Sequence, residues 1–188
     1  MRFAHAVPGA SWRCLLLLVM LFVLPAGAAT EDSTLAIQRI KAAFLYKFAS
    51  YVEWPAKAFR EADSPIVIGV AGADSIAAEL ERAVVGRTVS GRPLQVRRVA
   101  GGEGVECCQV LFIGAANDPE RTRELLTRAR GHPVLTVTEL ESEHPKGSII
   151  NFLNATDKVR FDISREAAER NGLQLRSQLL AVARQVSS

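Results

Sequence analysis

The side chains with the most distinctive chemistry are two adjacent thiols, Cys107 and Cys108. A thiol can serve as a nucleophile, a metal ligand or half of a disulfide. A bond between the two neighbours would close a small ring and distort the peptide between them, at a cost of about 3 kcal/mol, the scale of a non-proline cis bond. Two alternatives remain: a small buried thiol at Cys108, or a redox-active pair that forms a disulfide with a second molecule.

Cys108 also opens a short apolar run, 108–113, which is typical of a buried strand. Strand alternation predicts that Cys108 shares a face of the sheet with Val110 and Phe112, and that Cys107 points to the opposite face. The sequence therefore predicts one thiol in the core and one outside it.

Beyond the first 28 residues, the histidines available for acid–base or metal chemistry are His132 and His144. Each precedes a proline, which is typical of a turn, and neither has a metal-ligating neighbour at useful spacing. The chain has no Gly-x-Ser-x-Gly elbow and no phosphate loop, and Gly69 and Gly72 do not complete a dinucleotide fingerprint. We therefore expect a non-catalytic protein without a cofactor or a metal site.

Residues 1–28 have the three parts of a secretory signal peptide. Two arginines precede an apolar run over 14–24, and Pro25 and a triplet of small residues supply a helix breaker and a cleavage site. Eleven apolar residues would cover only about half of a 30 Å hydrocarbon core, so a membrane anchor is not favoured. We expect cleavage near Ala29 and a periplasmic mature chain, 29–188, that is not embedded in the membrane.

The charge balance does not favour a nucleic-acid partner. The chain has 23 Lys and Arg against 20 Asp and Glu, but Arg2 and Arg13 belong to the signal peptide, which leaves a net charge of about +1 on the mature chain. The remaining arginine clusters, at 97–98 and 121–130, are interleaved with glutamates or spread around a helix. Such clusters are typical of solvated faces and do not supply the attraction that DNA or RNA binding needs.

Helical and strand patterns alternate through the mature chain, which predicts a single α/β domain. The expected helices cover 35–52, 76–84 and 120–130, and a last one carries Leu175, Leu179, Val182 and Val186. The expected strands are 65–70, 93–99, 108–113 and 133–137, followed by the two arms of a hairpin, 148–153 and 158–163. The predicted fold is a three-layer sandwich with a mostly parallel sheet and an antiparallel edge hairpin.

Five aromatic residues fall within positions 44–54, at the end of the first expected helix. The apolar stripe of that helix is predicted to hold Ile37, Ile40, Phe44, Phe48 and Val52. Tyr46, Tyr51 and Trp54 lie off the stripe, and two roles are open for them: they fix the helix end to the core, with Trp54 as a plug, or they anchor a protein partner. The exposed face of the last helix, around Arg176 and Gln178, is the next candidate surface.

A series of short motifs runs in order over about residues 38–184. They are Lys41 to Tyr46, Glu53 to Pro55, Gly86 to Val89, Gly91 to Leu94, Cys108 to Ile113, Pro133 to Val137, Ile149 to Phe152, Val159 to Ile163, and Leu175 with Ser177 to Leu180. Together they resemble the YfiR-like family of periplasmic regulators. The resemblance implies an exported protein that represses an inner-membrane diguanylate cyclase through the cyclase's periplasmic portion, lowers cyclic-di-GMP, acts as a homodimer and is relieved by an outer-membrane lipoprotein.

The chain departs from the family pattern at two positions. The family commonly pairs the cysteine at position 108 with a distant cysteine, whereas the second mature cysteine here is the adjacent Cys107. The family also has histidine where this chain has Gln109. An intramolecular disulfide switch is therefore not expected.

A different function class is also open. A periplasmic small-molecule-binding component of an uptake or sensing system would place its ligand in the crevice at the carboxyl ends of the parallel strands. A diguanylate cyclase gene beside this one favours the regulator, and a transporter or receptor gene favours the binding component.

Overall fold

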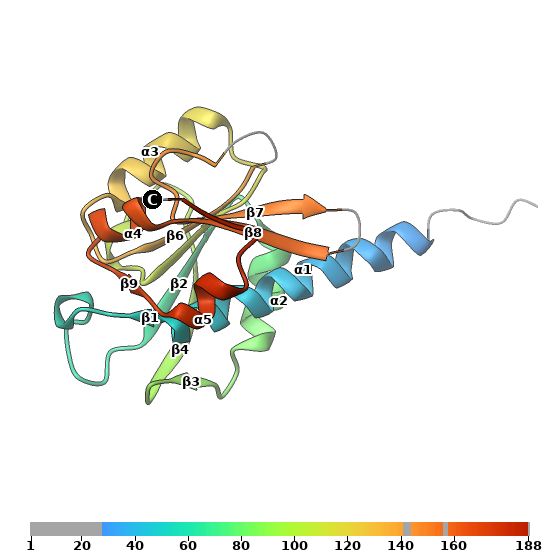
Figure 1. Cartoon of the computed structure of the whole chain (residues 1–188). Coiled ribbons are helices and arrows are strands. Elements are labelled where there is room, and N and C mark those ends of the chain that lie inside the picture. Colours follow the sequence, from blue (N-terminus) through green and yellow to red (C-terminus); the bar gives the residue numbers. More distant parts are fainter. Residues whose placement is uncertain (1–27, 141–143, 156–157, 188) are drawn as a thin grey trace, which may run out of the picture. The chain divides into compact units, whose positions relative to one another are not determined.

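The computed structural model describes residues 28–140, 144–155 and 158–187 (Figure 1). The predicted signal peptide lies, up to position 27, outside these residues. The larger of two compact units, Leu35–Ser188, contains the sheet. Among the described residues, no helix combines the length and the apolar character that crossing a bilayer requires.

An eight-stranded sheet runs through this unit in the order β10-β8-β7-β6-β5-β2-β4-β3. Its parallel strands are β4 (Arg92–Arg98), β2 (Ile66–Ala71), β5 (Val110–Ile113), β6 (Leu135–Glu139) and β7 (Ile150–Ala155). β8 (Lys158–Ser164) returns antiparallel to β7 as the predicted hairpin, and β3 (Thr88–Val89) ends the sheet beside β4. The central runs are apolar because both faces of these strands are covered. The α/β class and the mostly parallel sheet are confirmed.

Helices cover both faces of the sheet, in three layers. One face packs against α1 (Ala28–Phe48), α2 (Asp74–Ala83), α4 (Arg165–Arg170) and α5 (Ser177–Ala181), which contribute to one large apolar core. The other face packs against α3 (Pro119–Ala129) and the 3-10 turn η3 (Val105–Cys107) in a smaller core. Two further 3-10 turns, η1 (Ala49–Tyr51) and η2 (Ala56–Ala58), follow α1 and flank the two-residue strand β1 (Val52–Glu53).

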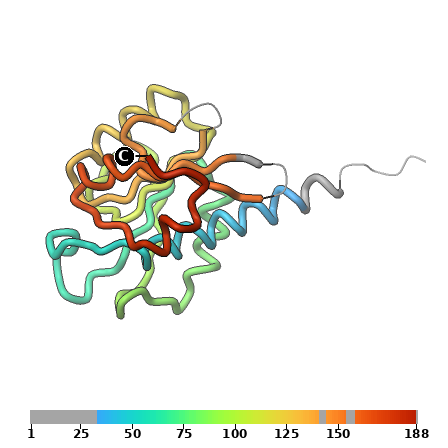
Figure 2. The backbone as a smooth tube through the Cα atoms, in the orientation of Figure 1, coloured from blue at the N-terminus to red at the C-terminus, as the bar shows by residue number. Residues whose placement is uncertain are grey.

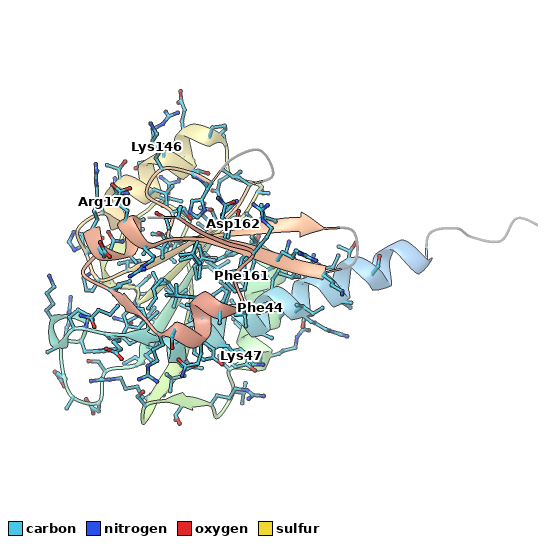
Figure 3. All side chains as sticks on the ribbon, viewed as in Figure 1. Phe44, Lys47, Lys146, Phe161, Asp162 and Arg170 are labelled. Carbon is cyan, nitrogen blue, oxygen red and sulfur yellow. The ribbon has the colours of Figure 1, made fainter. Side chains whose placement is uncertain are left out.

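Five phenylalanine rings form the centre of the larger core. They are Phe44, Phe48, Phe112, Phe152 and Phe161, of which Phe44 and Phe161 are labelled in Figure 3. The rings of Phe48 and Phe161 meet edge-on with their centroids 5.1 Å apart, and Phe44 lies 5.6 Å from Phe161. The aromatic end of α1 is thus held against the hairpin strands β7 and β8.

The predicted stripe of α1 is wrong at Ile40, whose side chain is 45% exposed. Two steps of four residues lead from Ile40 to Phe48, where α1 ends before Val52, and each step advances 40° beyond a full turn, so Ile40 lies about 80° around the helix from Phe48. The fully buried side of α1 holds Ala42 and Leu45 instead.

A charged pair lies at the edge of this core. Lys41 on α1 is 4% exposed, and its Nζ donates a hydrogen bond to Glu139 Oε1 at the carboxyl end of β6. Beside Glu139, the side chain of Asn151 accepts from the Leu140 N–H at 3.0 Å and donates to the Leu140 carbonyl at 2.9 Å. Asn151 therefore continues the pairing of β7 with β6 past the end of the strand.

The expected last helix over 175–186 is wrong in extent. The chain forms β9 (Gln174–Leu175), the five-residue α5 and then β10 (Gln185–Ser187), which pairs parallel with β8 outside the hairpin. Arg184 fixes this ending, because its Nε donates to Asp162 Oδ1 at 2.8 Å and its Nη2 donates to Oδ2 of the same carboxylate. Val182, which the helical spacing placed on the sheet, is 64% exposed.

Candidate functional site

Two ends of the folded unit meet at a small antiparallel ribbon. Strand β1 pairs with β9, with Val52 opposite Leu175 and Glu53 opposite Gln174. Figure 2 shows these two segments, cyan and red, side by side. The Arg176 N–H donates to the Tyr51 carbonyl at 2.9 Å and continues the ribbon by one residue. The ribbon thus brings the carboxyl-terminal candidate Arg176 to the aromatic candidates at the end of α1.

A groove of about 620 Å³ opens beside this ribbon, and we call it the aromatic groove. The residues that line it and carry its chemistry are Glu53, Trp54, Phe59, Arg60, Arg92 and Arg176. They come from β1, from the segment after η2, from the start of β4 and from the turn before α5. Aromatic and arginine side chains with a few carboxylates are the composition of protein-binding hot spots.

Trp54 combines the two roles that the sequence left open. Its Nε1–H donates to the Ala49 carbonyl at 3.0 Å, just past the end of α1, and its half-buried ring packs against the large core. Pro55 follows in extended conformation and leads the chain away from the helix. The ring therefore fixes the helix end and also forms part of the groove wall.

Arg92 organises the opposite wall of the groove. Its guanidinium carbon lies 3.7 Å from the centre of the Phe59 ring, in the range of a cation–π contact. Its Nη1 donates to the carbonyls of Ser64 at 2.8 Å and of Glu61 at 3.2 Å. These contacts hold the segment between η2 and β2 against β4.

The charges of Arg60 and Arg176 are available to a ligand of the groove. The Arg176 side chain is 50% exposed, and its Nε lies 3.7 Å from Glu53 Oε1. Arg60 is exposed, and its Nη2 lies 4.0 Å from Cys107 Sγ. The groove thus presents cations beside aromatic rings.

Three predicted partner-binding residues do not line the aromatic groove. Tyr51 is half-buried and packs against the large core beside the ribbon. Tyr46 is half-buried on α1, with the guanidinium carbon of Arg87 5.1 Å from the centre of its ring. Gln178 is exposed on α5. Sequence reasoning missed Phe59, Arg60 and Arg92, although Arg92 lies within the Gly-Arg-Pro-Leu motif.

The two cysteines are free thiols in different environments. Cys107 is half-buried at the surface, whereas Cys108 is 1% exposed and its Sγ–H donates to the Gly104 carbonyl at 3.4 Å. The prediction that Cys108 shares a face with Val110 and Phe112 is wrong. Its sulfur lies beside Gly69 and Leu111 on the smaller-core face, and a Cβ added to Gly69 would fall 2.7 Å from it. The reason is that Cys108 follows η3, and strand alternation begins only at Val110.

The thiols are expected to differ in reactivity. Burial raises the pKa of the Cys108 thiol to about 11, so at pH 8 only about one Cys108 in a thousand is thiolate. Iodoacetamide at pH 8 should therefore alkylate Cys107 in the folded protein and leave Cys108 unmodified, as read by tandem mass spectrometry that fragments the single peptide carrying both cysteines. In urea both thiols should react, and equal labelling in the folded state would contradict this assignment.

Metal chemistry receives no support from the described part of the chain. No group of three or more His, Cys, Asp and Glu side chains lies close enough together there to hold a metal ion. His144 Nε2 forms a hydrogen bond with the Ser148 carbonyl oxygen at 2.8 Å.

The carboxyl ends of β2 and β5, the expected place for a small ligand, are closely packed. Asn117 Nδ2 donates to the carbonyls of Ala71 at 2.9 Å and of Gly114 at 3.1 Å. A Cβ on Gly114 would fall 2.7 Å from the Gly72 carbonyl oxygen, so the two loops after these strands touch. This packing brings the two loops into direct contact at the expected ligand position.

A comparison with protein-family models gives one further finding. The model described as YfiR/HmsC-like matches residues 38–184, which span the sheet up to β10, the ribbon and the aromatic groove.

Proposed function

The chain belongs to the YfiR/HmsC-like family, and on this basis we propose that it is an exported repressor that binds the periplasmic part of an inner-membrane diguanylate cyclase through the aromatic groove. Members of this family are periplasmic regulators rather than catalysts. Repression of such a cyclase would lower cyclic-di-GMP in the cell.

The observation that supports the groove as the binding surface is its combination of fixed aromatic rings and accessible guanidinium groups. Trp54 and Phe59 are held by contacts within the chain, so a partner would not have to order them. Arg60 and Arg176 extend from the same groove into solvent and can pair with carboxylates of a partner. Rigid rings surrounded by arginines concentrate binding energy at the centre of an interface.

The resemblance also supports two finer parts of the proposal. One is a homodimer as the working form of the protein. The other is relief of repression by an outer-membrane lipoprotein, which would compete with the cyclase for this protein. Co-purification from solubilised membranes, with and without the lipoprotein, tests both.

The groove is tested by reversing an exposed charge. Arg176→Glu should raise cellular cyclic-di-GMP several-fold in a strain that carries the cyclase, because it places a carboxylate where the partner meets a cation. Arg60→Glu should act in the same direction. The amount of each variant in the periplasm and its melting temperature should stay close to wild type, because both side chains are exposed.

Arg165→Glu is the matched control, since Arg165 is equally exposed and lies on α4 outside the groove. This variant should repress like the wild type. Full repression by both groove variants would place the binding surface elsewhere, with Tyr46 and Gln178 as the next positions to change.

A further inference from the structure

A second cavity, which shares no lining residue with the aromatic groove, lies between α3, α4 and the segment 144–148. Its volume is about 500 Å³, and we call it the basic pocket. Four cationic side chains line it, namely Arg123, Arg130, Lys146 and Arg170. Figure 3 shows Lys146 and Arg170 on the side of α3 and α4, away from Lys47 and Phe44 of α1.

The arginines of α3 divide into two sets with different partners. Arg121 and Arg128 both pair with Glu124, at 2.6 Å and 3.0 Å, so this carboxylate offsets one of their two positive charges. Arg123 and Arg130 lie on the pocket side, two helical turns apart, and no ion pair joins them to any described residue. The sequence suggested that these arginines form one solvated surface. In the fold, two of them pair with Glu124 and the other two line the basic pocket.

The charge of the basic pocket is strongly unbalanced. Glu166 is its one carboxylate among the lining residues, and this group pairs with Arg170 at 2.6 Å. The lining therefore holds four permanent positive charges against one negative charge. Lys146 also has no ion pair among the described residues. Three cations thus converge on one concave surface without a counter-charge from the described chain.

The polar groups at the base of the pocket are already used within the fold. Asn171 accepts from the Gly131 N–H at 3.0 Å and donates to the Val134 carbonyl at 2.8 Å. Ser148 Oγ donates to the Ile150 carbonyl at 2.8 Å and is fully buried. The donors that remain for a ligand include the guanidinium and ammonium groups of Arg123, Arg130 and Lys146. Leu126 and Ala167 add a small apolar surface.

We propose that the basic pocket binds a small organic anion that carries phosphate groups or several carboxylates. Guanidinium groups bind both kinds of oxyanion through paired N–H donors, and a cavity of this size admits a ligand larger than a single ion. Such a site would allow a soluble metabolite to influence the protein from a surface separate from the aromatic groove.

Calorimetric titration of the mature protein at constant ionic strength tests this proposal, with pyrophosphate and citrate as probes and chloride as the reference anion. We expect saturable binding of at least one probe at a ratio of one per chain. The tighter probe identifies the phosphate or the carboxylate class. Arg123→Gln and Arg130→Gln should each weaken binding by about tenfold, because each removes a charged donor.

Arg128→Gln is the matched control, because it removes the same charge from the same helix on the side that pairs with Glu124. It should change the affinity less than twofold. Amide NMR shifts should locate the probe near Gly131 and Ala167. The proposal is overturned if neither probe saturates, or if Arg128→Gln weakens binding as much as Arg123→Gln does.

Discussion

Phe48→Ala is expected to lower the free energy of unfolding by about 3–5 kcal/mol, because it leaves a cavity where four aromatic rings meet. Phe48 is 1% exposed, and its ring contacts those of Phe44, Phe152 and Phe161 at centroid distances of 5.7, 5.8 and 5.1 Å. These rings join α1 to the hairpin strands, so the loss falls on the contact between two layers of the fold. Urea unfolding of the mature domain, followed by circular dichroism, measures the change.

Phe44→Ala and Tyr46→Ala serve as comparisons for the loss of stability in Phe48→Ala. The sequence placed Phe44 and Phe48 on the same apolar stripe, but Phe44 is only partly buried, and its truncation should cost less than that of Phe48. Tyr46→Ala should cost least, since the Tyr46 ring faces the Arg87 guanidinium at the surface of the core. A Phe48→Ala variant as stable as Tyr46→Ala would show that the core rearranges to fill the cavity.

Lys41→Met is expected to destabilise the fold by about 3–5 kcal/mol, although it replaces a charged residue by an apolar one of similar length. The substitution leaves the Glu139 carboxylate, whose side chain is 13% exposed, without its ammonium partner. A buried charge that has lost its partner retains its desolvation cost but none of the attraction that offset it. The same urea experiment measures this loss.

The double variant Lys41→Met with Glu139→Gln separates the charge from the packing. It also replaces the unpaired Glu139 carboxylate by a neutral amide, and it should recover part of the stability that Lys41→Met loses. A loss below about 1 kcal/mol for Lys41→Met alone would contradict the assignment, because that is the size expected of an exposed ion pair.

Local sequence patterns were sufficient for the central sheet. The apolar runs of β2 and β5 and the amphipathic spacing of α3 each depend on residues within about ten positions of one another. The same holds for the hairpin of β7 and β8. Such elements can be predicted because burial on one or both faces dictates their composition directly.

The aromatic groove could be predicted only in part, because contacts distant in sequence assemble it. The sequence suggested Trp54 and Arg176 as separate candidates, and the β1–β9 ribbon brings them together. Nothing in the neighbourhood of Phe59 or Arg60 indicates that they line one groove with Arg92, more than thirty positions further along the chain. These positions depend on register between strands, which a periodicity does not encode.

Two incorrect predictions have the same physical origin. The helical spacing of Leu175, Leu179, Val182 and Val186 is real, but the chain end pairs with β8 as strand β10. The ion pair between Arg184 and Asp162 stabilises this pairing. The prediction extended strand alternation back to Cys108. The turn η3 ends at Cys107 and β5 begins at Val110, so the alternating side-chain directions of the strand do not reach Cys108. In both cases a single irregular position overrides a regular pattern.

The two outer strands of the sheet constrain how copies of this protein can associate. β3 has two residues and β10 has three, so neither offers a backbone edge long enough to continue the sheet into a neighbouring molecule. Past the two residues of β4 that pair with β3, this strand carries the exposed Arg97, whose charge would repel the same residue of a second copy. Edge-to-edge polymerisation is therefore disfavoured at high protein concentration.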